Sequence, residues 1–149
     1  MIAETAQERL DEMRSRVHAR CVACGSVNGQ VPQLRFTVAQ DGGVEAWFPG
    51  GETFQGYDGI LHGGVIATLL DAAMTNCLFA HGCCGVTGEL RIRFRHPVVS
   101  GEPSRLRARI ERSTPPLFVL RAELWQSGRV RANATGKFME CPSEASSPG

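Results

Sequence analysis

Residues 62–80 read HGGVIATLLDAAMTNCLFA, and this stretch decides the fold. From Val65 to Ala80 nearly every residue is apolar or small, on all sides of a helical projection. A helix that is apolar all round is typically buried, so we expect this one to form the centre of the molecule. The run is too short and too interrupted by polar residues to predict a membrane span.

Asp71 is the only charged side chain between Gly63 and Ala80. A carboxylate inside a buried helix is costly unless something compensates it. Thr68, Asp71 and Thr75 follow the spacing i, i+3, i+7 and therefore form one narrow polar stripe. The sequence predicts a helix surrounded by hydrophobic neighbours, except along one narrow polar strip where the Asp71 carboxylate is accessible.

Gly63 and Gly64 open the same helix. The first-turn amides of a helix have no internal acceptor and lie at the positive end of its dipole. Two glycines leave those amides uncovered, so a ligand oxygen can approach and an oxyanion can be stabilised there. The alternative is a glycine-rich loop that simply ends at a helix.

The spacing of these two features predicts an oligomer. Gly63 and Asp71 lie about 12 Å apart along one helix, at ~1.5 Å rise per residue. A base that activates water must come within about 3–3.5 Å of the carbon whose oxygen the amides hold. One helix therefore cannot supply both the amide and the base to the same thioester. Two antiparallel copies about a two-fold axis could supply them, and the pair of copies would then contain two shared sites.

Composition sets mild bounds. The chain has 149 residues, with 16 Lys plus Arg and 15 Asp plus Glu, so its net charge favours neither nucleic acid nor a membrane as partner. The sequence shows no signal-peptide pattern, so we expect a cytoplasmic protein whose six cysteines are mostly reduced.

Two segments precede the strands. Residues 5–19 repeat apolar side chains at Leu10, Met13 and Val17, which predicts an amphipathic helix within an N-terminal segment 1–20. The sequence Cys21-Val22-Ala23-Cys24-Gly25 follows, which we call the cysteine turn. Zinc normally needs four ligands, and no second such pair or spaced histidine pair follows, so two partners are missing. We therefore expect a packed turn, no zinc and no structural disulfide.

The remaining pattern predicts an α+β fold. Leu34–Ala39 and Val44–Phe48 alternate around an Asp41-Gly42-Gly43 hairpin, and four longer alternating runs follow the central helix. Strict alternation means antiparallel strands with one buried face, so about six strands must curl around the helix. The predicted inward residues are Leu90, Ile92, Phe94, Leu106, Ala108, Ile110, Phe118, Leu120, Ala122, Leu124, Val130, Ala132, Ala134 and Phe138. We expect this domain to span residues 21–141, with a disordered tail over 142–149.

Three motifs together resemble a known family. They are GYDGILHGG at 56–64 with TLLD at 68–71, TGEL at 87–90, and RFRHPV at 93–98. They resemble the hotdog-fold acyl-CoA thioesterases, most of all the phenylacetate-pathway (PaaI-like) branch, over Cys21 to about Met139. The resemblance implies hydrolysis of an acyl-CoA thioester to a free acid and CoA. It also implies a homodimer or homotetramer and no metal or other cofactor.

The resemblance also implies catalytic roles. It places the oxyanion-hole amide at Gly63, and it makes Asp71 a general base or nucleophile supplied across the dimer interface. His62 matches the residue that shapes the thioester pocket, although it could simply cap the helix. Thr87 matches a hydroxyl that assists the water or the aspartate, although it could be an ordinary strand residue.

Further residues are candidates for binding the substrate. Gly64 lies beside the oxyanion amide. Gly56 occupies a position where many relatives carry Asn or Gln, and Gln55 beside it is the candidate substitute. Arginines alternate along two strands, and Arg95 with His96 at a strand end are the best candidates for CoA phosphates, the alternative being a solvated sheet face. We expect the acyl pocket to be set across the dimer by Phe54, Tyr57, Met74, Leu78 and Phe79.

Two other functions stay open. The first is a hotdog dehydratase or hydratase acting on acyl thioesters. Such relatives pair a catalytic histidine with a different acidic partner, and only His62 and Asp71 are available here. The second is a module that binds acyl-CoA without catalysis.

Overall fold

The computed structural model describes residues 3–25 and 34–141. Along the chain it forms α1 (Ala6–Val17), β1 (Thr37–Val38), β2 (Val44–Phe48), η1 (Glu52–Phe54), α2 (Gly63–Ala80), β3 (Gly85–Phe94), β4 (Ser104–Thr114), β5 (Leu117–Gln126) and β6 (Arg129–Glu140). The predicted disordered tail lies outside the described residues.

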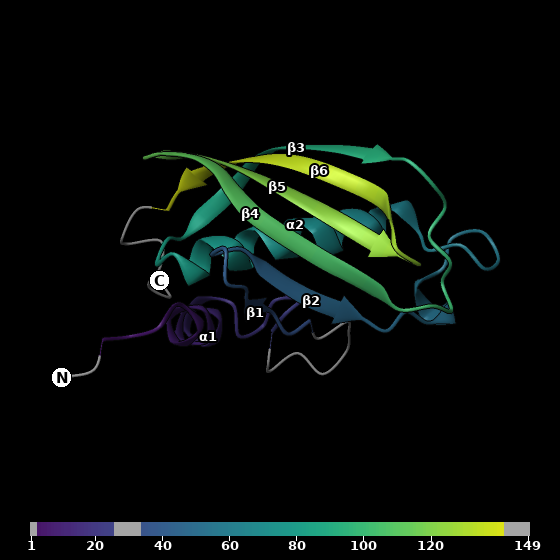
Figure 1. The fold of residues 1–149 in the computed structure, drawn as a ribbon, viewed down its shortest axis with the longest axis horizontal. Coiled ribbons are helices and arrows are strands. Elements are labelled where there is room, and N and C mark those ends of the chain that lie inside the picture. Colours follow the sequence, from purple (N-terminus) through teal and green to yellow (C-terminus); the bar gives the residue numbers. More distant parts are fainter. Residues whose placement is uncertain (1–2, 26–33, 142–149) are drawn as a thin grey trace.

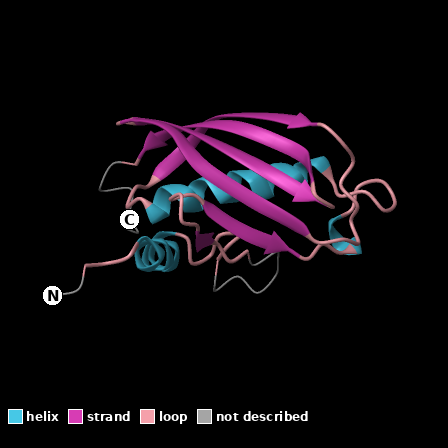
Figure 2. Cartoon of the chain, viewed as in Figure 1, coloured by secondary structure: helices cyan, strands magenta, loops and turns pink. Residues whose placement is uncertain are grey.

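One curved sheet covers one side of α2, and α1 lies on the other side (Figure 1). The sheet has six strands in the order β1-β2-β4-β5-β6-β3, and all neighbouring strands are antiparallel. Bulges interrupt the ladders of β3 with β6, β4 with β5, and β5 with β6, and bulges bend the strands that carry them. Figure 2 shows the resulting arch of strands over the helix, which confirms the predicted α+β architecture.

The helix α2 is the centre of the hydrophobic core. Every residue from Ala72 to Ala80 is buried, against the inward side chains of β4, β5 and β6. The helix comes so close to β6 that a Cβ at Gly136 would lie 2.9 Å from the sulfur of Met74. Its length is 18 residues, which falls within the range of a membrane span, so the expectation based on length does not hold. Its burial still argues against a membrane span, because 67% of this stretch is buried in the fold, as in a core helix.

The helix α1 covers the C-terminal half of α2. Thr5 caps it, accepting a hydrogen bond from Glu8 N at 3.1 Å, while the Glu8 carboxylate accepts one from Thr5 N. Leu10 and Met13 are buried, as the periodicity predicted, and Arg9 Nε donates to the Ala80 carbonyl at 3.2 Å. Among the described residues, no helix covers the N-terminal half of α2 in this way, since Gly63 and Gly64 are exposed and Asp71 is half-buried.

The inner face of β3 differs from the prediction. Leu90 and Ile92 are only half-buried, and Phe94 is 56% exposed. The strand lies at the edge of the sheet, so it has a neighbour on one side only. Alternation correctly predicted the face to which these side chains belong, but not how completely that face is covered.

Candidate active site

His62 ends the loop before α2 and caps the helix. Its Nδ1 accepts a hydrogen bond from Gly64 N at 2.8 Å. A backbone amide can only donate, so Nδ1 must be unprotonated and the neutral ring carries its proton on Nε2. The capping role considered from the sequence is therefore present, and it leaves an Nε2–H donor beside the first turn.

Gly63 carries the one first-turn amide that has no acceptor in the described part of the chain. Gly64 N is bound to the His62 ring, while Val65 N and Ile66 N both donate to the His62 carbonyl. The Gly63 amide is therefore free to bind a ligand oxygen at the positive end of the helix.

The two glycines are needed for different reasons. A Cβ at Gly64 would lie 3.0 Å from two atoms of the His62 ring, so Gly64 makes room for the cap. A Cβ at Gly63 would meet only the Phe94 ring, at 3.7 and 3.8 Å, which is ordinary contact. The backbone at Gly63 is thus not crowded, and its nearest neighbour is Phe94 at the end of β3.

Asp71 is held by a residue of β3. Thr87 Oγ1 donates to Asp71 Oδ1 at 2.7 Å, and the register of β3 with β6 shifts between Thr87 and Glu89. The other carboxylate oxygen of Asp71 has no partner among the described residues. Thr87 is thus more than an ordinary strand residue, because it fixes the rotamer of the carboxylate and leaves one oxygen available for chemistry.

The predicted polar stripe is narrower than expected. Thr75 is buried, and Thr68 Oγ1 donates to the Gly64 carbonyl at 3.0 Å within its own helix. The continuous helix Gly63–Ala80 keeps Gly63 and Asp71 about 12 Å apart along its axis, at ~1.5 Å rise per residue. The structure therefore brings Asp71 to Thr87, but it does not bring Asp71 to Gly63 within one copy of the chain.

The loop before α2 is closed by Gln55. Its Oε1 accepts a hydrogen bond from Gly59 N at 3.0 Å, and its backbone pairs with Leu61. Gly56 lies against His62, where a Cβ would be 3.3 Å from Cδ2 of the ring. The carbonyl end of the Gln55 amide is thus used to hold the loop, and only its NH₂ group remains for a substrate.

Three residues proposed for the acyl pocket belong to the core instead. Met74, Leu78 and Phe79 are at most 1% exposed, because they lie on the part of α2 enclosed by the sheet and α1. Tyr57 is 85% exposed and Phe54 is half-buried, so both remain candidates.

A hollow of about 560 Å³ on the outer face of the sheet contains the phosphate candidates. Arg95 Nε donates to Asn133 Oδ1 at 2.6 Å, and His96 lies beside it. Arg109 faces Arg121 directly across the β4–β5 pair, an arrangement of like charges that an anion would stabilise. The hollow is lined by Asp41, Arg95, His96, Arg107, Ala108, Arg109, Arg121, Ala122, Glu123, Arg129, Val130, Asn133 and Ala134.

The cysteine turn has one more potential ligand nearby than the sequence suggested. Nδ1 of His18 and the sulfurs of Cys21 and Cys24 all lie within 4.8 Å of one another. The expectation that two metal partners are missing was wrong for one of them, because His18, which precedes the cysteines in the sequence, lies beside both. The spacing H-x-x-C-x-x-C was the available signal.

Comparison with known proteins points to one family. A family profile described as the thioesterase superfamily matches residues 58–132. Acyl-coenzyme A thioesterase THEM4 of Bos taurus is 43% identical over 51 residues, which make up 34% of this chain and 20% of that protein. The matched stretch therefore spans only a fifth of this curated relative.

Solved structures share the fold. A phenylacetic acid degradation-related protein of Ralstonia eutropha JMP134 matches with a TM-score of 0.65 and 24% identity, over 76% of this chain and 96% of that one. A hypothetical thioesterase protein of Streptococcus pneumoniae TIGR4, solved with coenzyme A, matches with a TM-score of 0.68 and 20% identity, over 72% and 85%. The latter protein has also been solved with one aspartate, and separately one threonine, replaced by alanine. The hotdog fold implied by the sequence motifs is confirmed.

Proposed function

Because the chain belongs to the thioesterase superfamily, we propose that it hydrolyses an acyl-CoA thioester in a site shared by two copies of the chain. One observation carries this proposal. The unpaired amide of Gly63 and the Thr87-held carboxylate of Asp71 lie on the same uncovered half of one helix, too far apart to act on one thioester.

The uncovered surfaces support a two-fold dimer. The open half of α2 lies beside the edge strand β3, whose Val86 and Phe94 are 62% and 56% exposed. Apolar side chains and unpaired strand edges of this kind are normally covered. A two-fold axis beside Ala67, midway between Gly63 and Asp71, would place each carboxylate next to the partner's amide. The small side chain of Ala67 would let the two helices approach closely.

The reaction needs an oxyanion donor and a base or nucleophile. The Gly63 amide binds the thioester oxygen and stabilises the negative charge that develops on it. As general base, Asp71 takes a proton from water while the water oxygen bonds to the carbonyl carbon. Collapse of the tetrahedral intermediate then breaks the C–S bond, and the departing CoA sulfur takes up the proton. As nucleophile, Asp71 attacks the carbonyl carbon, the C–S bond breaks, and CoA leaves as a thiolate. Water then opens the resulting anhydride to the free acid and the Asp71 carboxylate, and the thiolate takes up the proton that is released.

The roles of Thr87 and His62 follow from their hydrogen bonds. Thr87 donates a hydrogen bond to Oδ1 of Asp71, so Oδ2 is the oxygen left to act on the reacting carbon or water. His62 offers Nε2–H close to the amide that binds the substrate. The two altered residues of the Streptococcus pneumoniae protein, an aspartate and a threonine, lie 16 positions apart, as Asp71 and Thr87 do here, and this supports the assignment.

The arginine-lined hollow fits the phosphates of CoA. Arg109 and Arg129 form no ion pair in the described ranges, whereas Arg107 and Arg121 pair with carboxylates at 3.6–3.8 Å. Arg95 and His96 directly follow β3, whose last residue, Phe94, touches the Gly63 position. A CoA phosphate near Arg95 would therefore lie at the same end of the molecule as the oxyanion amide.

A panel of acyl-CoAs assayed with a thiol reagent tests the proposal. We expect release of free CoA with saturation, and a loss of about 10²–10⁴-fold in kcat for Asp71→Asn with little change in KM. Asparagine keeps the acceptor for Thr87 but cannot take a proton. Saturable binding without turnover would mean a binding module, and loss of enoyl absorbance without free thiol would mean a hydratase; either result would refute hydrolysis.

A further inference from the structure

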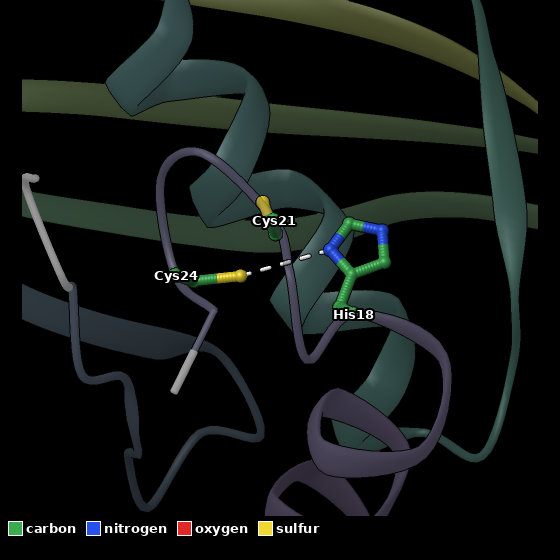
Figure 3. A group of neighbouring side chains, drawn as sticks. All are labelled: His18, Cys21 and Cys24. Atoms are coloured by element: carbon green, nitrogen blue, oxygen red, sulfur yellow. Dashed lines mark hydrogen bonds between the residues drawn. The ribbon is translucent and has the colours of Figure 1, made fainter. Parts of the chain in front are cut away.

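A second cluster of reactive side chains lies away from the proposed active site. Figure 3 shows His18, Cys21 and Cys24 pointing toward one another beside α2. His18 is the C-cap of α1, and its Nδ1 lies 3.7 Å from the Cys24 sulfur. In a tetrahedral zinc site with Zn–S of ~2.3 Å and Zn–N of ~2.0–2.1 Å, a sulfur and a nitrogen are about 3.6 Å apart. The donor atoms are thus already near the spacing of metal ligands.

The backbone of the cysteine turn is shaped around the Cys21 sulfur. Ala23 N donates to this sulfur at 3.4 Å, and Gly25 N closes the turn on the Cys21 carbonyl at 3.0 Å. A Cβ at Gly25 would lie 2.5 Å from the Ala19 carbonyl oxygen and from Cys21 N, so the turn requires glycine. Amide donors aimed at a sulfur stabilise its thiolate, which is the form that binds metals.

The surroundings hold the three side chains in place. The His18 ring packs edge-on against Phe79, with centroids 5.0 Å apart, and Arg14 Nη1 donates to the Cys24 carbonyl at 3.0 Å. Asn76 is fully buried and its amide also contacts the Cys24 thiol. Its Nδ2 donates to the Ala72 carbonyl at 2.8 Å, but its Oδ1 is the one buried side-chain oxygen or nitrogen in the described residues that has no partner. Such an unpaired acceptor is costly unless the site contains a further donor.

We propose that His18 Nδ1 and the sulfurs of Cys21 and Cys24 bind one borderline-soft divalent cation of the zinc class. Binding forms one metal–nitrogen and two metal–sulfur bonds, and the thiols release their protons to solvent. Two thiolates cancel the charge of the cation, so the site can be half-buried without a net charge. Three protein ligands leave one tetrahedral position for water.

The cation would link the end of α1 to the cysteine turn and so stabilise the packing of α1 on α2. The ligands come from the end of α1 and from the cysteine turn, and their supports, Asn76 and Phe79, belong to α2. The site lies on the covered half of α2, whereas Gly63 and Asp71 lie on the open half. It is therefore separate from the thioesterase site proposed above.

Cobalt(II) is a suitable probe because it takes the same tetrahedral ligands and absorbs visible light. The full chain, reduced and stripped with a chelator, is titrated with Co²⁺ and then with Zn²⁺. We expect one Co²⁺ per chain, tetrahedral visible bands and a thiolate-to-cobalt band in the near ultraviolet. Zinc should remove both signals, and it should raise the melting temperature because it binds only the folded chain.

Variants identify the ligands. Cys21→Ser and Cys24→Ser should abolish the thiolate band, and His18→Ala should weaken cobalt binding by at least about tenfold. His18 is only half-buried, so its variant tests the site even if a cysteine variant fails to fold. Cys84→Ser is the matched control, because it removes a half-buried thiol elsewhere, and binding should be unchanged.

Three results would overturn the proposal. The first is the absence of a thiolate–cobalt band in the reduced wild-type protein. The second is binding that survives Cys24→Ser but is lost in Cys84→Ser. The third is rapid oxidation of Cys21 and Cys24 to a disulfide without metal binding, which would make the turn a redox pair.

Discussion

Replacing Gly63 with proline removes a single group from the proposed active site, the amide N–H, and leaves the helix in place. Gly63 is the first residue of α2, where proline is tolerated because that amide has no intrahelical acceptor. His62 before it has φ −61° and ψ 134°, the extended conformation required of a residue that precedes proline. A Cβ at Gly63 would lie 3.7 and 3.8 Å from two atoms of the Phe94 ring, which is ordinary contact.

The expected effect is on rate and not on folding. Loss of one oxyanion donor costs about 10²–10³-fold in kcat, or ~2.7–4 kcal/mol. Gly63→Ala is the matched control, because it adds a Cβ but keeps the amide. Proline also restricts the unfolded chain, so the melting temperature of the Gly63→Pro variant should be unchanged or higher.

The assay is release of free thiol from the best acyl-CoA, with kcat and KM measured for both variants. We expect kcat of Gly63→Pro to be ~10²–10³ below that of Gly63→Ala. If the two kcat values agree within about threefold while both variants remain folded, Gly63 does not supply the oxyanion donor.

Three further substitutions test individual contacts. Thr87→Val keeps the shape but removes the donor to Asp71, so kcat should fall about 10–100-fold, the effect of losing a ~1.5–3 kcal/mol charged hydrogen bond; an unchanged kcat would argue against this positioning role. His62→Ala removes the helix cap and should destabilise the fold by ~1 kcal/mol in urea unfolding, whereas equal stability would mean that the cap contributes nothing. Gly136→Ala forces a Cβ to 2.7 Å from the Phe138 ring, so the free energy of unfolding should fall by ~1–3 kcal/mol; no loss would mean that the core can rearrange around it.

Periodicity was sufficient to predict the fold because most inward positions lie over α2. Leu106, Leu120 and Phe138 alternate in the sequence and are at most 1% exposed. Phe94 alternates in the same way but lies on the edge strand, and it is 56% exposed among the described residues. Burial at an edge depends on neighbours that alternation does not describe.

The site was predictable in its parts but not in its pairings. Gly63 and Asp71 stand out because a glycine pair and a lone carboxylate are unusual in an apolar helix. The bond between Thr87 and Asp71 depends on the register of β3 and its bulge, which the pattern of residues does not specify. The H-x-x-C-x-x-C spacing marks His18 as a candidate, but its approach to Cys24 depends on where α1 ends.

Activity of mixed dimers tests the shared site most directly. Copies carrying Asp71→Asn and copies carrying Gly63→Pro are co-expressed with different tags, and heterodimers are purified by both tags. Each heterodimer contains one site with an intact amide and carboxylate and one site that lacks both, so we expect about half of the wild-type kcat per dimer, although each parent dimer is nearly inactive. Heterodimers no more active than the parents, or an active wild-type monomer, would contradict a site built from two copies of the chain.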